Sequence, residues 1–160
     1  MSGVGISIDI AGLERAIGAI GRLANLDESA LLETLGALGE RQTRRRIESE
    51  KTSPDGAPWA PNREGTSILL RSGEHLRDSI AYEVSTPLVR WGSSWRYAHV
   101  HQNGATIVPK SAKALAFTSG GKRRFAKRVT IPARPFVGVS AANGAEIRRD
   151  VVAWLGSQLR

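Results

Sequence analysis

The sequence predicts a single α+β domain, in which an antiparallel or mixed sheet packs against a long helix from the N-terminal half and an amphipathic C-terminal helix. The chain has 160 residues, which is a usual length for one domain. Apolar residues recur at helical spacing over 27–50 and 145–159, and short alternating segments lie between these two regions. Helices that flank a run of strands are typical of α+β folds.

The N-terminal part predicts a strand followed by two helices. Apolar residues alternate with small or polar ones from Val4 to Ile10, the pattern of a half-buried strand. A helical pattern then starts near Gly12 and continues to Leu23. Asp27 can cap a second helix, which we expect to run to about Glu50. Its apolar stripe consists of Leu31, Leu35, Leu38 and finally Ile47.

Residues 51–75 predict a long mobile loop. Prolines and glycines interrupt every pattern there, at Pro54, Gly56, Pro58, Pro61, Gly65 and Gly73. A loop of this length inside a compact domain is usually functional or disordered, so we expect it to become ordered on assembly. Trp59 is its only large aromatic residue. Such a side chain either anchors the loop on its own core or contacts a partner.

Strands dominate the next region. Ser79–Thr86 and Leu88–Ser93 flank a Thr-Pro break and predict a β-hairpin or consecutive strands. One or two helical turns are expected over Trp95–Gln102, because Asn103-Gly104 suits a helix end. Further short strands are predicted at Ala105–Val108, Ala114–Thr118 and Val129–Ile131, with 119–124 as an exposed basic hairpin tip. Ala145–Leu159 then forms the amphipathic terminal helix.

The charge of the chain is concentrated in its second half. The net charge is +8, with −3 over residues 1–83 and +11 over residues 84–160. A basic surface of this kind binds a polyanion, docks on an acidic protein surface, or is only a solvated face of the molecule. The candidate DNA contacts are Lys122, Arg123, Arg124, Lys127 and Arg128. No base-reading motif accompanies them, so a sequence-independent DNA-binding protein is the alternative function.

The sequence does not predict an enzyme, a cofactor site or a metal site. There is no cysteine, and no Gly-x-Ser-x-Gly elbow, phosphate loop or dinucleotide fingerprint is present. His99 and His101 could share a metal ion only if they lay on a strand, and a third ligand is missing nearby. No apolar run approaches the roughly 20 residues that span a bilayer, so we expect a protein that does not enter membranes.

Several motifs, in order along the chain, resemble the phage virion morphogenesis family, the tail-completion proteins of Mu-like contractile-tailed phages. The resemblance begins at about Arg41 and continues to the C-terminus. The motifs are an Arg-rich helix end at Arg41–Ile47, Ser-Pro-Asp-Gly-x-Pro-Trp at Ser53–Trp59, Leu-x-Ser-Gly-x-x-Leu at Leu70–Leu76, Gly92-Ser93, Tyr-Ala-x-x-His-Gln-x-Gly at Tyr97–Gly104, and Ile-Pro-Ala-Arg-Pro-Phe-x-Gly at Ile131–Gly138.

The resemblance implies a structural subunit that acts late in virion assembly. We expect tail completion, as a tail terminator or as a neck subunit joining head to tail, by a ring that is hexameric to match tail symmetry. Its partners would be further copies of itself and tail tube, tail sheath or head-connector proteins. It would be found in the virion and, during assembly, in the host bacterial cytoplasm. The expected interface residues are Trp59, Tyr97, His101, Arg134 and Phe136.

Two of these expectations depend on position. Arg134 stands between two prolines, so its guanidinium is presented rather than mobile. It either contacts a carboxylate or carbonyl of a neighbour or neutralises an acid of its own domain. The basic tip at Lys122, Arg123 and Arg124 would line the lumen of the ring along the path of the DNA, or dock on an acidic protein at the rim.

Overall fold

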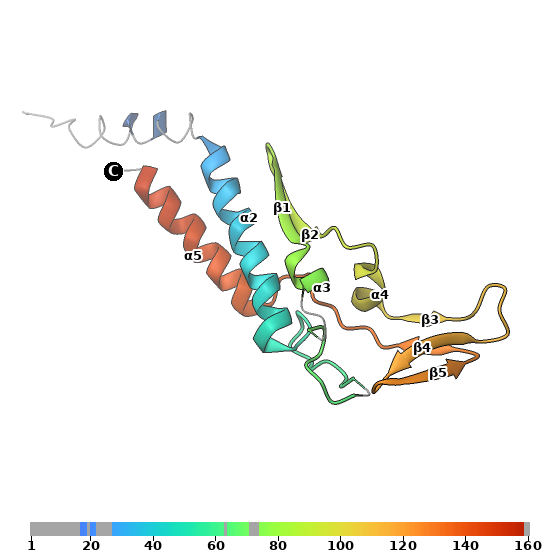
Figure 1. The fold of residues 1–160 in the computed structure, drawn as a ribbon. Helices are drawn as coiled ribbons and strands as arrows, with labels where there is room; N and C mark the ends of the chain where they lie inside the picture. Colours follow the sequence, from blue (N-terminus) through green and yellow to red (C-terminus); the bar gives the residue numbers. More distant parts are fainter. Residues whose placement is uncertain (1–16, 19, 22–26, 63, 71–73, 159–160) are drawn as a thin grey trace, which may run out of the picture.

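The computed structural model describes residues 17–18, 20–21, 27–62, 64–70 and 74–158 (Figure 1). The strand expected from Val4 to Ile10 lies outside the described residues. So do residues 71–73 and most of the helix expected from Gly12 to Leu23, of which residues 17–18 and 20–21 are described and helical.

The long helix of the N-terminal half is confirmed. Helix α2 spans Glu28–Arg45 and continues into one π-helical turn, η1, at Arg46–Glu50. Asp27 caps it by accepting a hydrogen bond from the backbone N–H of Ser29 at 3.0 Å. The Ser29 hydroxyl also donates to this carboxylate, and it contributes most to lowering the pKa of Asp27, followed by the backbone contact. The helix ends at Lys51, which adopts the left-handed conformation with φ of 55°.

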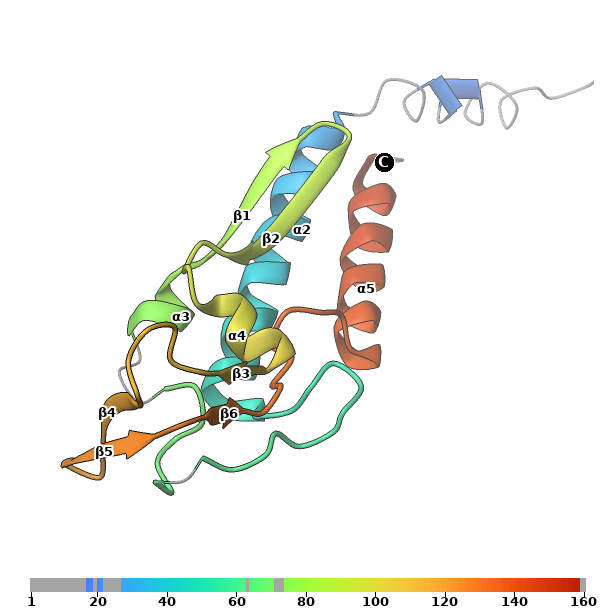
Figure 2. The same ribbon diagram turned by 90° about the vertical axis from the view of Figure 1, so that its right-hand side faces the viewer.

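Six strands form three separate antiparallel pairs within the described part of the chain. Strand β1 (Ile80–Ser85) pairs with β2 (Leu88–Ser93), β3 (Ala105–Ile107) with β6 (Val129–Ile131), and β4 (Leu115–Ser119) with β5 (Lys122–Ala126). The expectation of a single sheet is therefore corrected. Helix α4 (Ala98–Asn103) follows β2 and lies between the first pair and the other two, so their edges do not meet (Figures 1 and 2).

The β4–β5 pair forms the predicted hairpin. Gly120 and Gly121 connect the strands with φ values of 58° and 73°. A two-residue turn with both φ values positive matches the twist of the flanking strands, and glycine adopts it without strain. In both views the hairpin extends away from the body of the molecule (Figures 1 and 2).

The two long helices lie side by side, and the β1–β2 hairpin packs on the other side of α2 (Figure 1). Helix α5 spans Ala141–Gln158 and starts four residues before the position expected from the sequence. A short helix, α3 (Glu74–Asp78), precedes β1 and was not predicted. The combination of long helices with antiparallel strand pairs confirms the α+β class.

The core lies at the C-terminal end of α2, where distant parts of the chain meet. Its buried apolar residues come from η1, the following loop, α3, β1, α4 and the segment before α5; they are Ile47, Trp59, Leu76, Ile80, Ala98 and Phe136. Because no two neighbouring elements supply this core alone, its formation fixes the whole domain.

Two glycines of α2 accommodate the aromatic rings of the β1–β2 hairpin. Tyr82 and Trp91 are direct cross-strand partners, and both rings lie against the helix, at Gly36 and Gly39. A Cβ atom at Gly39 would lie 2.5 Å from the Trp91 ring. The glycines therefore permit a closer approach of hairpin to helix than any other residue would allow.

The substitution Gly39→Ala tests this packing. Alanine favours a helix over glycine by about 1 kcal/mol. Here we expect the reverse, a loss of about 1–3 kcal/mol from overpacking against Trp91. Thermal unfolding should show a lower midpoint, by roughly 2–4 °C for each kcal/mol lost. Gly156→Ala in α5 is the matched control, because no atom lies within 4 Å of its added Cβ. Equal midpoints for the two variants would contradict the close approach.

Candidate functional site

The segment Ile131–Gly138, here called the 131–138 segment, is the point on which the other sequence motifs converge. It runs from β6 to the start of α5, and side chains from the end of α2, from the 51–62 loop and from α4 bind its backbone. Three residues make these contacts: Arg46, Trp59 and Gln102. Arg134 belongs to the segment itself, and its side chain binds the 51–62 loop in return. Each of the four belongs to one of the motifs noted in the sequence.

Arg46 is the most buried of these residues, with a relative exposure of 0%. Its Nη1 donates to the carbonyl oxygens of Phe136 at 3.0 Å and Gly138 at 2.8 Å, and its Nη2 donates to Asn143 Oδ1. Its Nε lies 3.7 Å from a Glu50 carboxylate oxygen. Burial lowers the pKa of Arg46, and the Glu50 charge opposes that shift. The guanidinium thus joins the end of α2 to the 131–138 segment and α5.

Asn143 carries this connection into α5. Its Oδ1 also accepts from the Ser140 backbone N–H at 3.3 Å, and its own N–H donates to Ser140 Oγ at 3.1 Å, the arrangement of an N-cap. Gln42 Nε2 donates to the Asn143 carbonyl oxygen at 3.3 Å and to Glu146 at 2.7 Å. Arg45 lies 3.1 Å from the same Glu146. The first turn of α5 is therefore held on α2 by polar contacts.

Gln102 binds the opposite side of the 131–138 segment. Its Oε1 accepts from the N–H groups of Phe136 at 2.9 Å and Val137 at 3.1 Å, and its Nε2 donates to the Val137 carbonyl at 3.1 Å. The side-chain amide thus satisfies backbone N–H and C=O groups that a neighbouring strand would pair with in a sheet. Gly104 follows, with φ of 72°, and a Cβ there would lie 2.8 Å from the Ala133 nitrogen. In the sequence, Gln102 stands out only as part of the Tyr97–Gly104 motif, and no local pattern indicates this role.

Arg134 binds carbonyl oxygens of its own chain. It is 6% exposed, and its Nε and Nη2 donate to the carbonyl oxygens of Ala60 at 2.9 Å and Pro61 at 3.2 Å. Its backbone N–H donates to His101 O at 2.8 Å. The guanidinium therefore fixes the 51–62 loop of its own chain, and its contact with a neighbouring subunit stays a prediction. Burial lowers the pKa of Arg134.

Trp59 anchors the same loop. Its indole is 5% exposed in the core, and Nε1 donates to the Pro135 carbonyl at 3.1 Å. Backbone bonds from Ser53 N–H to Ala57 O at 2.8 Å and from Trp59 N–H to Lys51 O at 2.9 Å shape the loop. Of the two roles open to Trp59, these contacts support the anchor on the core of its own chain, and the ordering of the loop on assembly stays a prediction.

Three aromatic rings stack beside α4. Trp95 lies between His75, at a centroid distance of 6.2 Å, and His101, at 5.6 Å. Burial, with a smaller contribution from the Arg134 charge, lowers the pKa of His101. Tyr97 packs edge-on against Trp95 and is exposed, whereas Phe136 lies in the core. Of the five residues expected at a subunit interface, Tyr97 alone is exposed.

The described residues do not form a metal centre. His99 and His101 lie two residues apart on helix α4, so their side chains point in different directions. No group of three histidine, aspartate or glutamate side chains in the described ranges could hold an ion. Likewise, none of the described helices has the length and apolarity needed to cross a bilayer.

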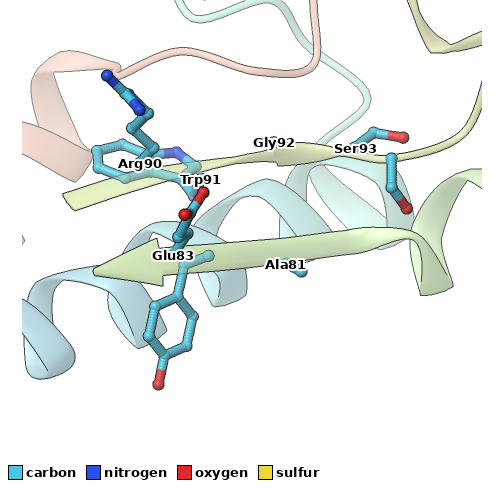
Figure 3. Close-up of a pocket in the computed structure, with 8 residues that line it drawn as sticks. Ala81, Glu83, Arg90, Trp91, Gly92 and Ser93 are labelled. Carbon is cyan, nitrogen blue, oxygen red and sulfur yellow. The ribbon is translucent and has the colours of Figure 1, made fainter. Parts of the chain in front are cut away.

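A shallow depression of about 340 Å³ lies over the β1–β2 hairpin (Figure 3). Small residues line its middle, with Ala81 opposite Gly92, and Glu83 and Arg90 are cross-strand partners at one end. Ser93 lines the other end, and its hydroxyl is hydrogen-bonded to Ser79 at 2.6 Å. No pair in this depression places a nucleophile beside a general base.

The predicted basic residues lie on the β4–β5 hairpin and just beyond it. Lys122, Arg123, Arg124, Lys127 and Arg128 are all exposed. The Arg123 guanidinium lies over the Phe125 ring at 5.3 Å. At the tip, Glu64 accepts from Ser119 Oγ at 2.8 Å and from the Gly120 N–H at 3.0 Å. The 51–70 region therefore holds the tip of the hairpin in place.

Comparison with known proteins shows which family the sequence matches. A model of the phage virion morphogenesis family matches residues 8–156. Tail completion protein S of Escherichia phage P2 is 27% identical over 143 residues, which cover 89% of this chain and 93% of that protein. No solved structure matches the chain significantly.

Substitutions of Trp59 test whether its indole anchors the core of its own chain or contacts a partner. We expect Trp59→Ala to lower the free energy of unfolding by about 3–5 kcal/mol, because a large core side chain is lost. Trp59→Phe keeps most of the packing and loses the bond to Pro135 O, at a cost of about 1 kcal/mol for the bond. Denaturant unfolding of both variants measures this order. An unchanged midpoint for Trp59→Ala would show that the indole does not hold the core.

Proposed function

The chain belongs to the phage virion morphogenesis family, and on that premise we propose that it is a structural subunit that completes the phage tail as a closed ring. The name of the P2 relative supports the step of assembly, tail completion. The ring would sit at the end of the tail, as a terminator or as part of the neck that joins tail to head. Its partners would be tail tube, tail sheath or head-connector proteins.

The observation that supports this proposal is that the polar side chains of the motifs bind groups of the chain itself. Arg46, Gln102 and Arg134 direct their polar atoms at backbone groups of the chain itself, and Arg46 also binds the Asn143 side chain. Their side chains are thus occupied in holding the 131–138 segment and the loop beside it. Side chains with these contacts stabilise one rigid shape, which is what an assembly subunit requires.

Exposed apolar surface on α5 supports assembly with further copies. Asn143 is the one buried residue of this helix among those described, whereas four of its apolar residues remain half-exposed: Ile147, Val151, Trp154 and Leu155. Val152 is 62% exposed. Such a helix is stabilised when a neighbour covers its apolar side chains. We assign that neighbour to a second copy of the chain, with exposed Tyr97 as a further proposed contact.

A closed ring follows from a heterologous contact. Helix α5 lies on one side of α2, and the β1–β2 hairpin lies on the other (Figure 1). A contact between two different surfaces repeats from copy to copy, and it closes into a ring when the rotation between copies divides a full turn. The proposed ring is hexameric, to match the symmetry of a contractile tail.

Val152→Asp tests the assembly proposal. A carboxylate at the centre of an apolar contact is desolvated without a partner, so we expect the ring to dissociate while the monomer keeps its thermal midpoint. Size-exclusion chromatography with light scattering measures the mass. Ala153→Asp places the same charge at the adjacent exposed position of α5 and should weaken the ring less. A monomeric wild-type chain at assembly concentrations, or an intact ring with Val152→Asp, would contradict the proposal.

A further inference from the structure

We infer that the β4–β5 hairpin with its flanking residues, 110–128, is an arm that binds the sugar-phosphate backbone of duplex DNA without sequence preference. This basic arm contains no acidic residue. Its seven cationic side chains are all exposed: Lys110, Lys113, Lys122, Arg123, Arg124, Lys127 and Arg128. The inference goes beyond the proposed function, since a ring can complete a tail without touching DNA.

The pairing of the strands places cations on both faces of the arm. Lys122 lies opposite Ser119, and Arg124 lies opposite Phe117. Directly paired residues share a face, and successive residues alternate between faces. Arg123, opposite Thr118, therefore projects from the other face, together with Phe125. The two faces are positively charged, and the ribbon between them is two strands wide.

A two-stranded ribbon with this charge pattern fits a groove of duplex DNA. The major groove is about 12 Å wide and admits a two-stranded β-ribbon. The long lysine and arginine side chains on both faces of the ribbon can then reach the phosphates that flank the groove, whereas a ribbon lying flat on an acidic protein would use the cations of one face only.

The cations of the arm are also free to bind phosphate. Within the described residues, none of the seven forms a salt bridge with an acidic side chain. Phe125 is 65% exposed under the Arg123 guanidinium and offers an apolar contact to sugar or base.

Glu64 gives the arm a fixed direction. Its carboxylate accepts two hydrogen bonds at the tip, from Ser119 Oγ and the Gly120 N–H. The base of the arm leads through β6 into the 131–138 segment. An arm held at both ends loses less conformational freedom on binding than a disordered basic tail would.

Fluorescence anisotropy with a short labelled duplex of mixed sequence tests the inference on the full chain. We expect wild-type binding between about 50 and 200 mM salt, with an affinity that falls as salt rises. The variant Lys122→Gln/Arg123→Gln/Arg124→Gln should bind about tenfold more weakly or worse. Its salt slope should be shallower by up to about 2.7, since each phosphate contact contributes about 0.9. Phe125→Ala should weaken binding and keep the slope.

The matched control is Arg90→Gln/Arg148→Gln/Arg149→Gln, which removes the same charge from exposed positions outside the arm. Equal losses in the two triple variants would show that net charge alone acts, and this would overturn the inference. So would an absence of binding by the wild type at low salt. A wild type that fails to bind DNA and an arm variant that fails to join tails would assign the arm to an acidic protein.

Two readouts keep this result separate from the proposed ring. Circular dichroism and the thermal midpoint of the arm variant should match the wild type, because the three side chains are exposed and glutamine retains their length. The mass of the assembly should also be unchanged. DNA binding without a ring would refute the proposed function alone, and a ring without DNA binding would refute the arm alone.

Discussion

The rest of the structure depends on the burial of one guanidinium. Arg46 has no exposure to solvent, and a charged group in that position is costly unless it is paired and hydrogen-bonded. The carbonyls of Phe136 and Gly138 and the side chain of Asn143 must converge on its Nη1 and Nη2 for that to happen. Its Nε has no hydrogen-bond acceptor and lies 3.7 Å from a Glu50 carboxylate oxygen. One side chain thus specifies how the end of α2, the 131–138 segment and α5 meet. A fold in which they meet otherwise would leave a buried charge unpaired.

This constraint connects the two surfaces to which we assign assembly and DNA binding. Helix α5 begins at Ala141, directly after the 131–138 segment, and the basic arm lies directly before β6 at the other end of that segment. The angle between helix and arm is therefore set where Arg46, Gln102 and Trp59 bind the segment. A rigid centre with an exposed surface at each end suits a subunit that repeats around an axis.

Local patterns in the sequence predicted local structure, and contacts between distant residues were not predictable from it. The Asp27 cap, the end of α4 at Gly104 and the Gly120-Gly121 hairpin each follow from a few adjacent residues. The contacts of Trp59 and Arg134 could not be predicted, because their acceptors are backbone carbonyls 76 and 74 residues away, at Pro135 and Ala60. A carbonyl belongs to every residue, so no sequence pattern marks the one that is used. The glycine pair at Gly36 and Gly39 was a signal that could have located the hairpin contact on α2.

The free energy of unfolding of Arg46→Lys tests the central constraint most directly. Lysine keeps the positive charge, but its single ammonium cannot span the three acceptors that the planar guanidinium joins. We expect a loss of more than about 3 kcal/mol, since two hydrogen bonds of a charged group are worth about 1.5–3 kcal/mol each. Arg41→Lys, at an exposed position of the same helix, should cost less than about 0.5 kcal/mol. A cost for Arg46→Lys as small as that of Arg41→Lys would show that the fold does not depend on the buried guanidinium.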